Sequence, residues 1–498
     1  MRHRLAIAAG SSLGTLAAAE IARAGGNAVD ACVAAAIMGW VSEPFFTSIG
    51  GSGFVAVRTP DDHVEIIDGN NIMPFTVPDE PGQGIRRIFL ADYADGIHMG
   101  IGGGSVGVPG VLAAFALAWE RHGKIEWSAL FEGAIKAARE GFPFPRVSDY
   151  YLSCTWDVIW SQFDEAGKTF SVDGRPMREG ELLVQPRLGD ALEMIAEKGA
   201  AVFYEGELAD EIASAIARDG GFLNTDDLAR YTAEVRAPVS TVAFGWEIDS
   251  NPPPAVGGAT LIHMLALLEH AELDEPHARL KAVVEAQSAA MGYRQERYQD
   301  PDGIAAAFKD AIDGLPARTR GSADTTHSSA ADADGYACSI TESNGYGSGL
   351  VIHGMLLNNT LGEEELNPLG FHRLPPGSRC HSNMAPTIAR GPDKTVAMGS
   401  PGADRIVGAI AQTFLRLALD GASLAEAVAG PRAHLDVRPE GERLCYEPGL
   451  DGDKVGYTPR PYDAPHMFFG AVQAASVTAD GVVDAAHDAR RSGGTALV

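Results

Sequence analysis

The tripeptide Thr325-Thr326-His327 is the part of this sequence whose residue types and setting best suit covalent catalysis. It follows a stretch rich in turn residues, 314–322, and precedes an alternating strand pattern. If the bond between Asp324 and Thr325 were cut, Thr325 would carry its hydroxyl nucleophile and an α-amino general base on one residue. A Thr pair at a hairpin entrance without any catalytic role is the alternative, because turns collect such residues.

Length, composition and charge place the chain among large globular proteins. Its 498 residues are 45% hydrophobic and 21% charged, which is enough for a sizeable core. The 39 basic and 66 acidic residues give a net charge of −27, which argues against nucleic acid or an anionic membrane as a partner. No apolar run reaches the roughly 18 residues that a membrane span needs, so none is expected.

The N-terminus and the cysteines indicate the same compartment. The first apolar stretch breaks at Gly10-Ser11-Ser12, which is too early for a secretory signal peptide. The five cysteines are scattered and contain no C-x-x-C pair, a usage typical of reduced thiols. We therefore expect a cytoplasmic protein.

Alternating helices and strands without an internal repeat make up the rest of the chain. Strands are expected over 54–57 and 64–67, and they dominate between Thr325 and the last helix. Helices first and last with a strand-rich middle are typical of a layered sandwich, and no linker marks a domain boundary. Apolar residues recur at helical spacing in the segments 15–24, 28–40, 111–121, 128–139, 188–198, 208–218, 259–270, 280–296 and 405–419.

Neither a nucleotide-binding loop nor a metal site is expected from the sequence. The glycine-rich stretch 102–110 precedes a helix, as a phosphate-binding loop would, but it lacks both the GK[ST] sequence and the acidic residue of a dinucleotide site. Turn glycines explain it more simply. His327, His353, His372 and His381 show no metal-ligand spacing and are interpreted as satisfied or solvated side chains. We expect no metal and no cofactor.

A series of short motifs resembles the γ-glutamyltransferase family of N-terminal-nucleophile hydrolases almost from end to end. Each motif is weak alone, but their order along the chain is specific. In that order they include AGGNAVDA (24–31), SEP (42–44), IGGSGF (49–54), SVGVPG (105–110), TTH (325–327), DADG (332–335), NN (358–359), MAPT (384–387), GSPG (399–402), PRAH (431–434) and DARRSG (488–493).

The resemblance implies an α+β fold, a four-layer αββα sandwich made as one precursor. The precursor would cut itself before Thr325 into a large segment, 1–324, and a small one, 325–498, which stay interlocked. Thr325 would be the nucleophile. Backbone N–H groups of Gly402 and Ala403 would form the oxyanion hole, and Ser343 would supply a supporting hydroxyl.

In the substrate-binding positions, the sequence departs from the family pattern. Asn70 stands where typical members use an Arg to bind the α-carboxylate, and a neutral amide cannot make that charge-assisted contact. The acid that meets the α-amino group corresponds to Glu363 or Glu364. Other candidate substrate-binding residues are Asn344 in a shortened loop and the pair Ser382-Asn383 in place of two serines.

Three functions remain open at this point. The leading hypothesis is an autoprocessing amide hydrolase or acyltransferase for γ-glutamyl or related small acyl amides, with water or an amine as acceptor. The second keeps this chemistry but takes a non-glutamyl amide, as acylase-like or oxamate-amidohydrolase-like members do. The third is an unprocessed, non-catalytic binding protein. The large and small segments are each other's expected partners, with further oligomerisation left open.

Overall fold

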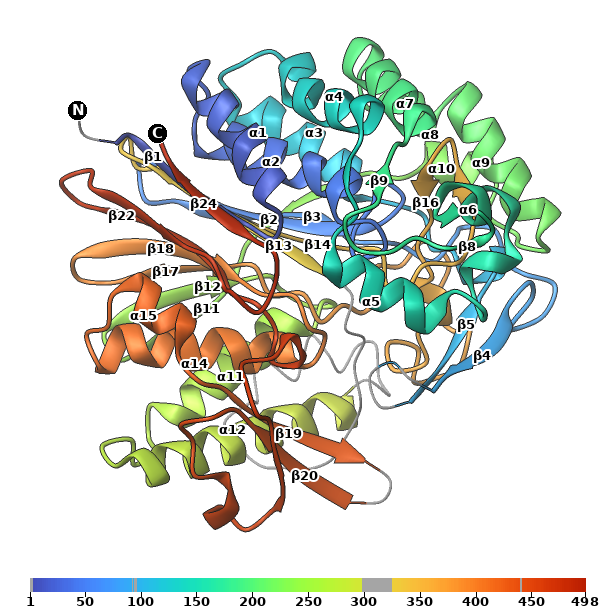
Figure 1. The fold of residues 1–498 in the computed structure, drawn as a ribbon. Coiled ribbons are helices and arrows are strands. Elements are labelled where there is room, and N and C mark those ends of the chain that lie inside the picture. The colour runs from blue at the N-terminus through green and yellow to red at the C-terminus, as the bar shows by residue number, and fades with distance from the viewer. Residues whose placement is uncertain (1–2, 92, 94–95, 298–324, 439–440) are drawn as a thin grey trace.

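Two β-sheets lie face to face in the computed structural model, and helices cover their outer faces (Figure 1). The structure describes residues 3–91, 93, 96–297, 325–438 and 441–498, so the expected turn-rich loop 314–322 lies outside the described residues. The layer order is helix, sheet, sheet, helix. This is the expected αββα sandwich.

The first sheet has seven strands, and the strand that begins at Thr326 is one of its inner strands. Every residue of that strand, β13, is buried, because the strand has a helix layer on one side and the second sheet on the other. The strand order is β10 (Glu234–Arg236), β3 (Val64–Gly69), β2 (Ser52–Arg58), β14 (Ala337–Ser343), β13 (Thr326–Asp332), β1 (Leu5–Ala9) and β24 (Gly494–Leu497).

The second sheet has six strands, and each neighbouring pair of strands is antiparallel. It packs against β13, β14 and β1 of the first sheet. The strand order is β11 (Val239–Ala243), β12 (Trp246–Ser250), β17 (Thr387–Arg390), β18 (Lys394–Gly399), β22 (Gln473–Thr478) and β23 (Val483–Ala486).

Helices form the two outer layers (Figure 1). Over the first sheet lie α1 (Ser12–Arg23), α2 (Ala28–Ser42), α3 (Val111–His122), α4 (Glu132–Glu140) and α7 (Pro186–Lys198). Over the second lie α11 (Gly257–Leu268), α12 (Pro276–Arg297), α14 (Arg405–Leu419) and α15 (Leu424–Ala429). All residues of α2 are buried, which matches its alanine-rich sequence, and an Asn27–Asp30 capping box starts it.

Smaller elements surround this sandwich. Further helices are α5 (Arg146–Thr155), α6 (Asp164–Thr169), α8 (Ala201–Tyr204), α9 (Glu207–Arg218) and α10 (Thr225–Ala229). One additional sheet joins β19 (Ala433–Arg438), β20 (Gly441–Tyr446) and β21 (Thr458–Pro461). Short strand pairs are β4 (Arg86–Leu90) with β5 (Ile97–Ile101), β6 (Phe142–Pro143) with β9 (Leu182–Leu183), β7 (Ser171–Val172) with β8 (Arg175–Pro176), and β15 (Val351–Ile352) with β16 (Met355–Leu356).

The structure differs from the expected helix at 128–139 and agrees with the interpretation of the glycine-rich stretch. The helix expected over 128–139 is instead a 3₁₀ turn, η2 (Trp127–Phe131), followed by α4, because tight 3₁₀ turns commonly begin helices. In the glycine-rich stretch, a Cβ at Gly104 would lie 1.8 Å from the backbone oxygen of Gln83. Glycine there serves close backbone packing, as the sequence indicated.

His327 lies between the two sheets as a neutral structural side chain. Its Nδ1 is 2.8 Å from Thr341 Oγ1, and its Nε2 is 2.7 Å from Ser329 Oγ. Burial lowers its pKa to about 3. The histidine that follows the Thr pair is therefore satisfied inside the sandwich, which confirms its interpretation from sequence.

Candidate active site

Four neighbouring strands of the first sheet place four polar side chains in a row at one edge. Asn70 follows β3, Ser52 begins β2, Ser343 ends β14 and Thr325 precedes β13. The strands are adjacent in the order β3-β2-β14-β13, with Ser343 paired with Ser52 in the antiparallel register. Strand order and register, rather than loop folding, bring these residues together.

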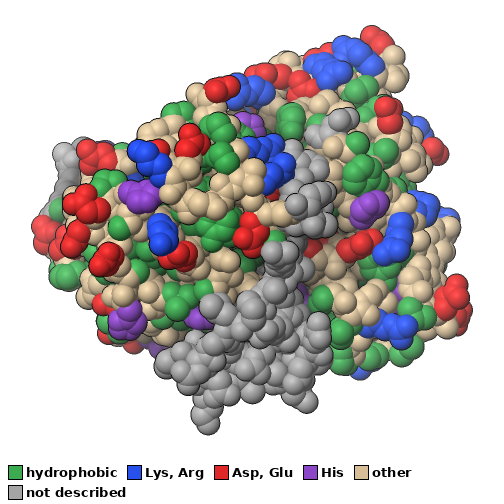
Figure 2. Space-filling model, turned by 90° about the horizontal axis from the view of Figure 1, so that it is seen from below, with side chains coloured by type: hydrophobic (Ala, Val, Ile, Leu, Met, Phe, Trp, Pro, Cys, Tyr) green, Lys and Arg blue, Asp and Glu red, His purple; other side chains and the backbone are tan. Residues whose placement is uncertain are grey.

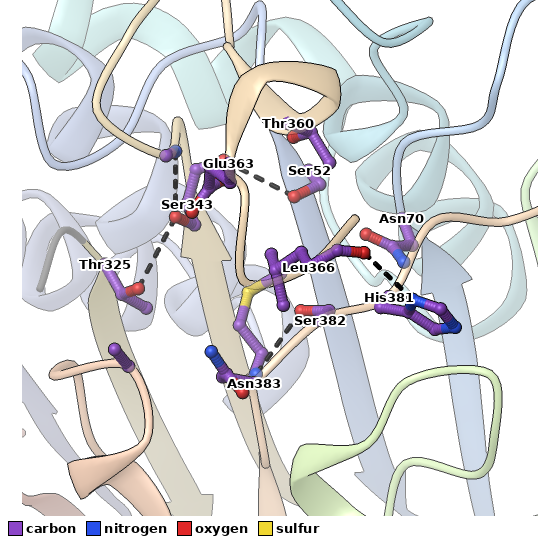
Figure 3. Close-up of a pocket in the computed structure, with 13 residues that line it drawn as sticks. Ser52, Asn70, Thr325, Ser343, Thr360, Glu363, Leu366, His381, Ser382 and Asn383 are labelled. Atoms are coloured by element: carbon purple, nitrogen blue, oxygen red, sulfur yellow. Dashed lines mark hydrogen bonds between the residues drawn. The ribbon is translucent and has the colours of Figure 1, made fainter. Parts of the chain in front are cut away.

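Thr325 and Ser343 form a hydroxyl pair at this edge. In Figure 3 their side chains point toward one another, and Thr325 Oγ1 donates a hydrogen bond of 3.4 Å to Ser343 Oγ. Ser343 Oγ also accepts from the backbone N–H of Gly345 at 3.1 Å, which fixes its position. Thr325 is 4% exposed and lines a pocket, so its hydroxyl is screened from bulk solvent but borders a cavity.

The second sheet contributes a turn directly after β18. Gly402 and Ala403 have φ angles of +123° and +58°, and a left-handed conformation is unusual for alanine. Within the described part of the chain, neither backbone N–H donates a hydrogen bond, so both donors are available to a ligand. Ala403 lines the pocket with Thr325, whereas Gly402 is not among the lining residues.

Most of the expected substrate-binding residues also line the same pocket. Asn70 Nδ2 donates to the backbone oxygen of Cys380 at 2.6 Å, which leaves its amide oxygen turned toward the pocket (Figure 3). Glu363, Ser382 and Asn383 complete this wall. Among the described lining residues, Glu363 is the only carboxylate, and neither Lys nor Arg occurs.

Two of the expected substrate-binding residues do not line the pocket. Glu364 makes an ion pair of 3.0 Å with Arg87 at the surface, so the structure favours Glu363 over Glu364 as the pocket acid. Asn344 is fully buried, and neither its amide nitrogen nor its amide oxygen has a hydrogen-bond partner among the described residues. The roles of all these side chains in binding stay predictions.

The two arginines that follow Asn70 in β4, Arg86 and Arg87, do not replace the arginine expected in its place. Arg86 pairs with Asp219 at 2.9 Å and Arg87 with Glu364, both away from the pocket. Arg379 lies closer, since its Nη1 donates to the backbone oxygen of Asn70 at 2.9 Å, but it is outside the lining. The described pocket therefore offers no guanidinium to a carboxylate.

Several lining residues were not singled out from the sequence. His381, interpreted as a satisfied or solvated side chain, borders the cavity, with its Nδ1 2.9 Å from the backbone oxygen of Leu366. A role in the site had no sequence signal, because loops that are distant along the chain meet here. The others are Ser52, Gly345, Thr360, Leu366 and Met384.

Other kinds of site find little support in the described residues. No group of three or more His, Cys, Asp or Glu side chains among them could hold a metal ion. In the described part of the chain, no helix is both long and apolar enough to cross a bilayer. On the face shown in Figure 2, acidic and basic side chains are interspersed.

Known proteins match this chain along most of its length. The family model for Gamma-glutamyltranspeptidase matches residues 14–314 and 306–498. The glutathione hydrolase proenzyme of Escherichia coli (strain K12) is 29% identical over 535 residues, covering 97% of this chain and 90% of the relative. The Acylase ACY 1 proenzyme of Pseudomonas sp. (strain SE83) is 29% identical over 459 residues, covering 84% and 80%.

A solved structure extends the likeness to the whole fold. A cephalosporin acylase from Bacillus halodurans superposes with a TM-score of 0.80, over 99% of this chain and 96% of its own, at 24% identity. Both the family match and the fold therefore cover nearly the entire chain. The protein belongs to the gamma-glutamyltranspeptidase family.

Proposed function

We propose that this protein is an autoprocessing N-terminal-threonine amide hydrolase or acyltransferase for small acyl amides, with Thr325 as its nucleophile. The observation that carries the proposal is the Thr325–Ser343 hydroxyl pair at the edge of the central strands. The N–H groups of Gly402 and Ala403, which have no partner among the described residues, support it as candidate oxyanion-hole donors, because they lie in the turn after β18 and Ala403 lines the pocket with Thr325.

Self-cleavage is the first step of the proposed chemistry. The Thr325 hydroxyl attacks the carbonyl carbon of the preceding peptide bond, and the C–N bond breaks as the acyl group moves from nitrogen to oxygen. Water then hydrolyses the ester, which releases a carboxylate and leaves Thr325 with a free α-amino group. Ser343 supports this step by holding the Thr325 hydroxyl in place.

The two products would remain associated because their strands are interleaved. β13 lies between β1 and β14, and β14 pairs in turn with β2 (Figure 1). In the second sheet, β12 from the large segment pairs with β17 from the small one. We therefore infer one αββα unit made of residues 1–324 and 325–498 after cleavage.

Turnover would use the same groups on an external amide. The α-amino group of Thr325 takes the proton from its own hydroxyl as the oxygen attacks the substrate carbonyl, and it returns the proton to the leaving amine. The N–H groups of Gly402 and Ala403 stabilise the charge that develops on the carbonyl oxygen. Water or an acceptor amine then releases the acyl group.

The pocket charge favours particular acyl groups. Glu363 can accept an ammonium group, whereas the described lining has no Lys or Arg for a carboxylate, and Asn70 offers only an amide. The cavity volume open to the centres of water molecules is small, at about 30 Å³. A single water needs roughly 10–15 Å³ of such space. A small acyl amide without an α-carboxylate, the acylase-like alternative, is therefore the second candidate substrate.

A denaturing gel and a substrate screen test the proposal together. Wild-type protein should give two bands, and Thr325→Ala should give one full-length band and no amidase activity. The screen compares γ-glutamyl, glutaryl and oxamate-like amides. Wild-type protein that stays intact yet hydrolyses amides would rule out this mechanism, and protein that neither cuts itself nor hydrolyses anything would support the binding-protein alternative.

A further inference from the structure

A buried carboxyl group lies directly behind the nucleophile. Glu43 follows the last residue of α2 and is 5% exposed. The hydroxyl of Thr326, the residue after the nucleophile, lies 2.9 Å from both of its carboxylate oxygens. A Cβ at Gly10 would stand 2.3 Å from Thr326 Oγ1 and 2.7 Å from Glu43 Oε1. Close packing at this glycine therefore confines the hydroxyl and the carboxylate together.

Arg491 connects this carboxyl group to the backbone of the nucleophile itself. Its Nη1 donates a hydrogen bond of 2.8 Å to the carbonyl oxygen of Thr325, and its guanidinium lies 4.7 Å from the centre of the Phe46 ring. Its positive charge favours the ionised form of Glu43. Glu43 is thus coupled to Thr325 by its hydrogen bond with the Thr326 hydroxyl and by electrostatic attraction to Arg491.

A second buried carboxyl group, Glu342, faces the first. It pairs with Thr326 in the β13–β14 register, and Trp40 Nε1 donates to its Oε2 at 2.7 Å. A Cβ added at Gly39 would lie 3.2 Å from Glu342 Oε1 and 3.5 Å from Glu43 Oε2. The two carboxyl groups are therefore neighbours across this glycine.

Burial and the surrounding charges decide which carboxyl group is ionised. Burial raises the pKa of Glu342 well above its ordinary value, and the nearby Glu43 adds to this. Burial also raises the pKa of Glu43, but only to about 7, because Arg491 and the Thr326 hydroxyl oppose it. Within the pair, burial therefore favours the proton on Glu342, whereas Arg491 and the Thr326 hydroxyl favour the negative charge on Glu43.

We propose that Glu43 is a positioning residue for the Thr325 nucleophile, acting through the Thr326 hydroxyl and Arg491. The inference rests on the proposed function, since it presupposes that Thr325 attacks an amide. Ionised Glu43 holds the Thr326 hydroxyl and orients Arg491, which in turn holds the Thr325 carbonyl. Protonated Glu43 no longer attracts Arg491, so the backbone that carries the nucleophile is held less firmly.

The pH dependence of a charge-removing variant tests this role. Glu43→Gln keeps the size of the side chain but has no charge at any pH. We expect kcat about ten-fold lower at pH 8.5 with KM within about two-fold, since small misplacements of reacting groups are costly. The ratio of wild-type to variant kcat should fall toward one at pH 5.5, where wild-type Glu43 is protonated as well. The Thr325 amine titrates in both proteins, and a lower amine pKa in Glu43→Gln would change the ratio in the same direction. Thr326→Val keeps the Glu43 charge, so a lower kcat in that variant separates positioning from an effect on the amine.

Two further variants separate positioning from general stability. Glu65→Gln is the matched control, because Glu65 is a buried carboxylate on β3 that pairs with Arg121 at 2.7 Å, at the end of the strand away from the pocket. It should lower the thermal midpoint and leave kcat and its pH profile unchanged. Thr326→Val removes one of the two links and should lower kcat at unchanged KM, even if Glu43→Gln fails to fold.

The outcomes distinguish this inference from the proposed function. A wild-type to Glu43→Gln ratio that stays constant between pH 5.5 and 8.5 would overturn the positioning role. Unchanged kcat in Thr326→Val would do the same if Glu43→Gln does not fold. If wild-type protein neither processes itself nor hydrolyses an amide, the proposed function fails first, and the gel reveals that before any variant is compared.

Discussion

The nucleophile side and the recognition side of the pocket are built in different ways. Thr325 and Ser343 lie at the ends of paired central strands, so backbone register fixes their separation. Glu363, Ser382 and Asn383 come instead from loops, around the 3₁₀ turn η4 (Thr360–Gly362) and before β17. Loops accept substitutions that a central strand does not.

This difference explains where the chain keeps the family pattern and where it departs from it. By the resemblance of its motifs, the catalytic side keeps the Thr pair and the strand-end hydroxyl, with Ala403 in place of a usual second glycine in the turn after β18. On the recognition side, the resemblance puts Asn70 where an arginine is expected, and the described lining has no Lys or Arg. Reaction type and substrate choice can therefore change separately within this fold.

The largest effect should come from the oxyanion turn. Gly402→Pro deletes a backbone N–H, and loss of one oxyanion donor typically lowers the rate by about 10²–10³. Proline also cannot adopt the φ of +123°, so the thermal midpoint must be measured beside kcat. Ser343→Ala should slow processing and turnover while the protein stays folded. Full activity in both variants would contradict the assignment of Gly402 and Ser343 to the catalytic side.

An intermediate effect should come from the recognition side. Asn70→Arg restores a carboxylate partner and should raise kcat/KM on γ-glutamyl anilides by about ten- to a hundred-fold, because a hydrogen bond to a charged group contributes roughly 1.5–3 kcal/mol. Glutaryl amides keep the carboxylate and lack only the α-amino group, so they should gain as well, whereas a 4-aminobutyryl amide, which has the amine but no carboxylate, should gain little. Asn70→Gln is the matched control and should give no gain. Strong wild-type preference for the γ-glutamyl substrate, lost in Asn70→Arg, would contradict this view of the pocket.

The smallest effect concerns stability behind the nucleophile. The pKa of Glu43 is about 7 in the folded protein against an ordinary value of 4.5. The folded protein therefore keeps a proton that the unfolded chain releases, and the free energy of unfolding falls by up to about 3 kcal/mol as pH rises between those values. Glu43→Gln does not titrate, so its thermal midpoint relative to the parent should rise by a few degrees from pH 4.5 to 7.5.

A single uncut chain is needed for that measurement. Both proteins should carry Thr325→Ala, so that processing does not differ between them. Midpoints that run parallel over the whole pH range would mean that Glu43 has an ordinary pKa in the folded state. The positioning role would then lose its electrostatic basis while the hydrogen bond to Thr326 remained.

Much of the architecture could be predicted from local sequence patterns. Helical periodicity located α14 at 405–419, the bounds that the structure shows, and the Thr pair marked the start of a strand. The motif order indicated the fold and made Thr325 the candidate nucleophile. Periodicity and turn signals depend on neighbouring residues, and motif order depends only on position along the chain. A single sequence therefore contains all of them.

Contacts between distant segments required the tertiary structure. Glu363 and Glu364 are equivalent by motif, but only the turn η4 decides that the first lines the pocket and the second pairs with Arg87. His381 carried no signal at all, because a loop places it beside the cavity. Glu43 and Arg491 each stood within a recognised motif, yet their approach to the nucleophile joins opposite ends of the chain. Local patterns set the helices, the strands and the candidate nucleophile, whereas packing decided which buried charges surround it.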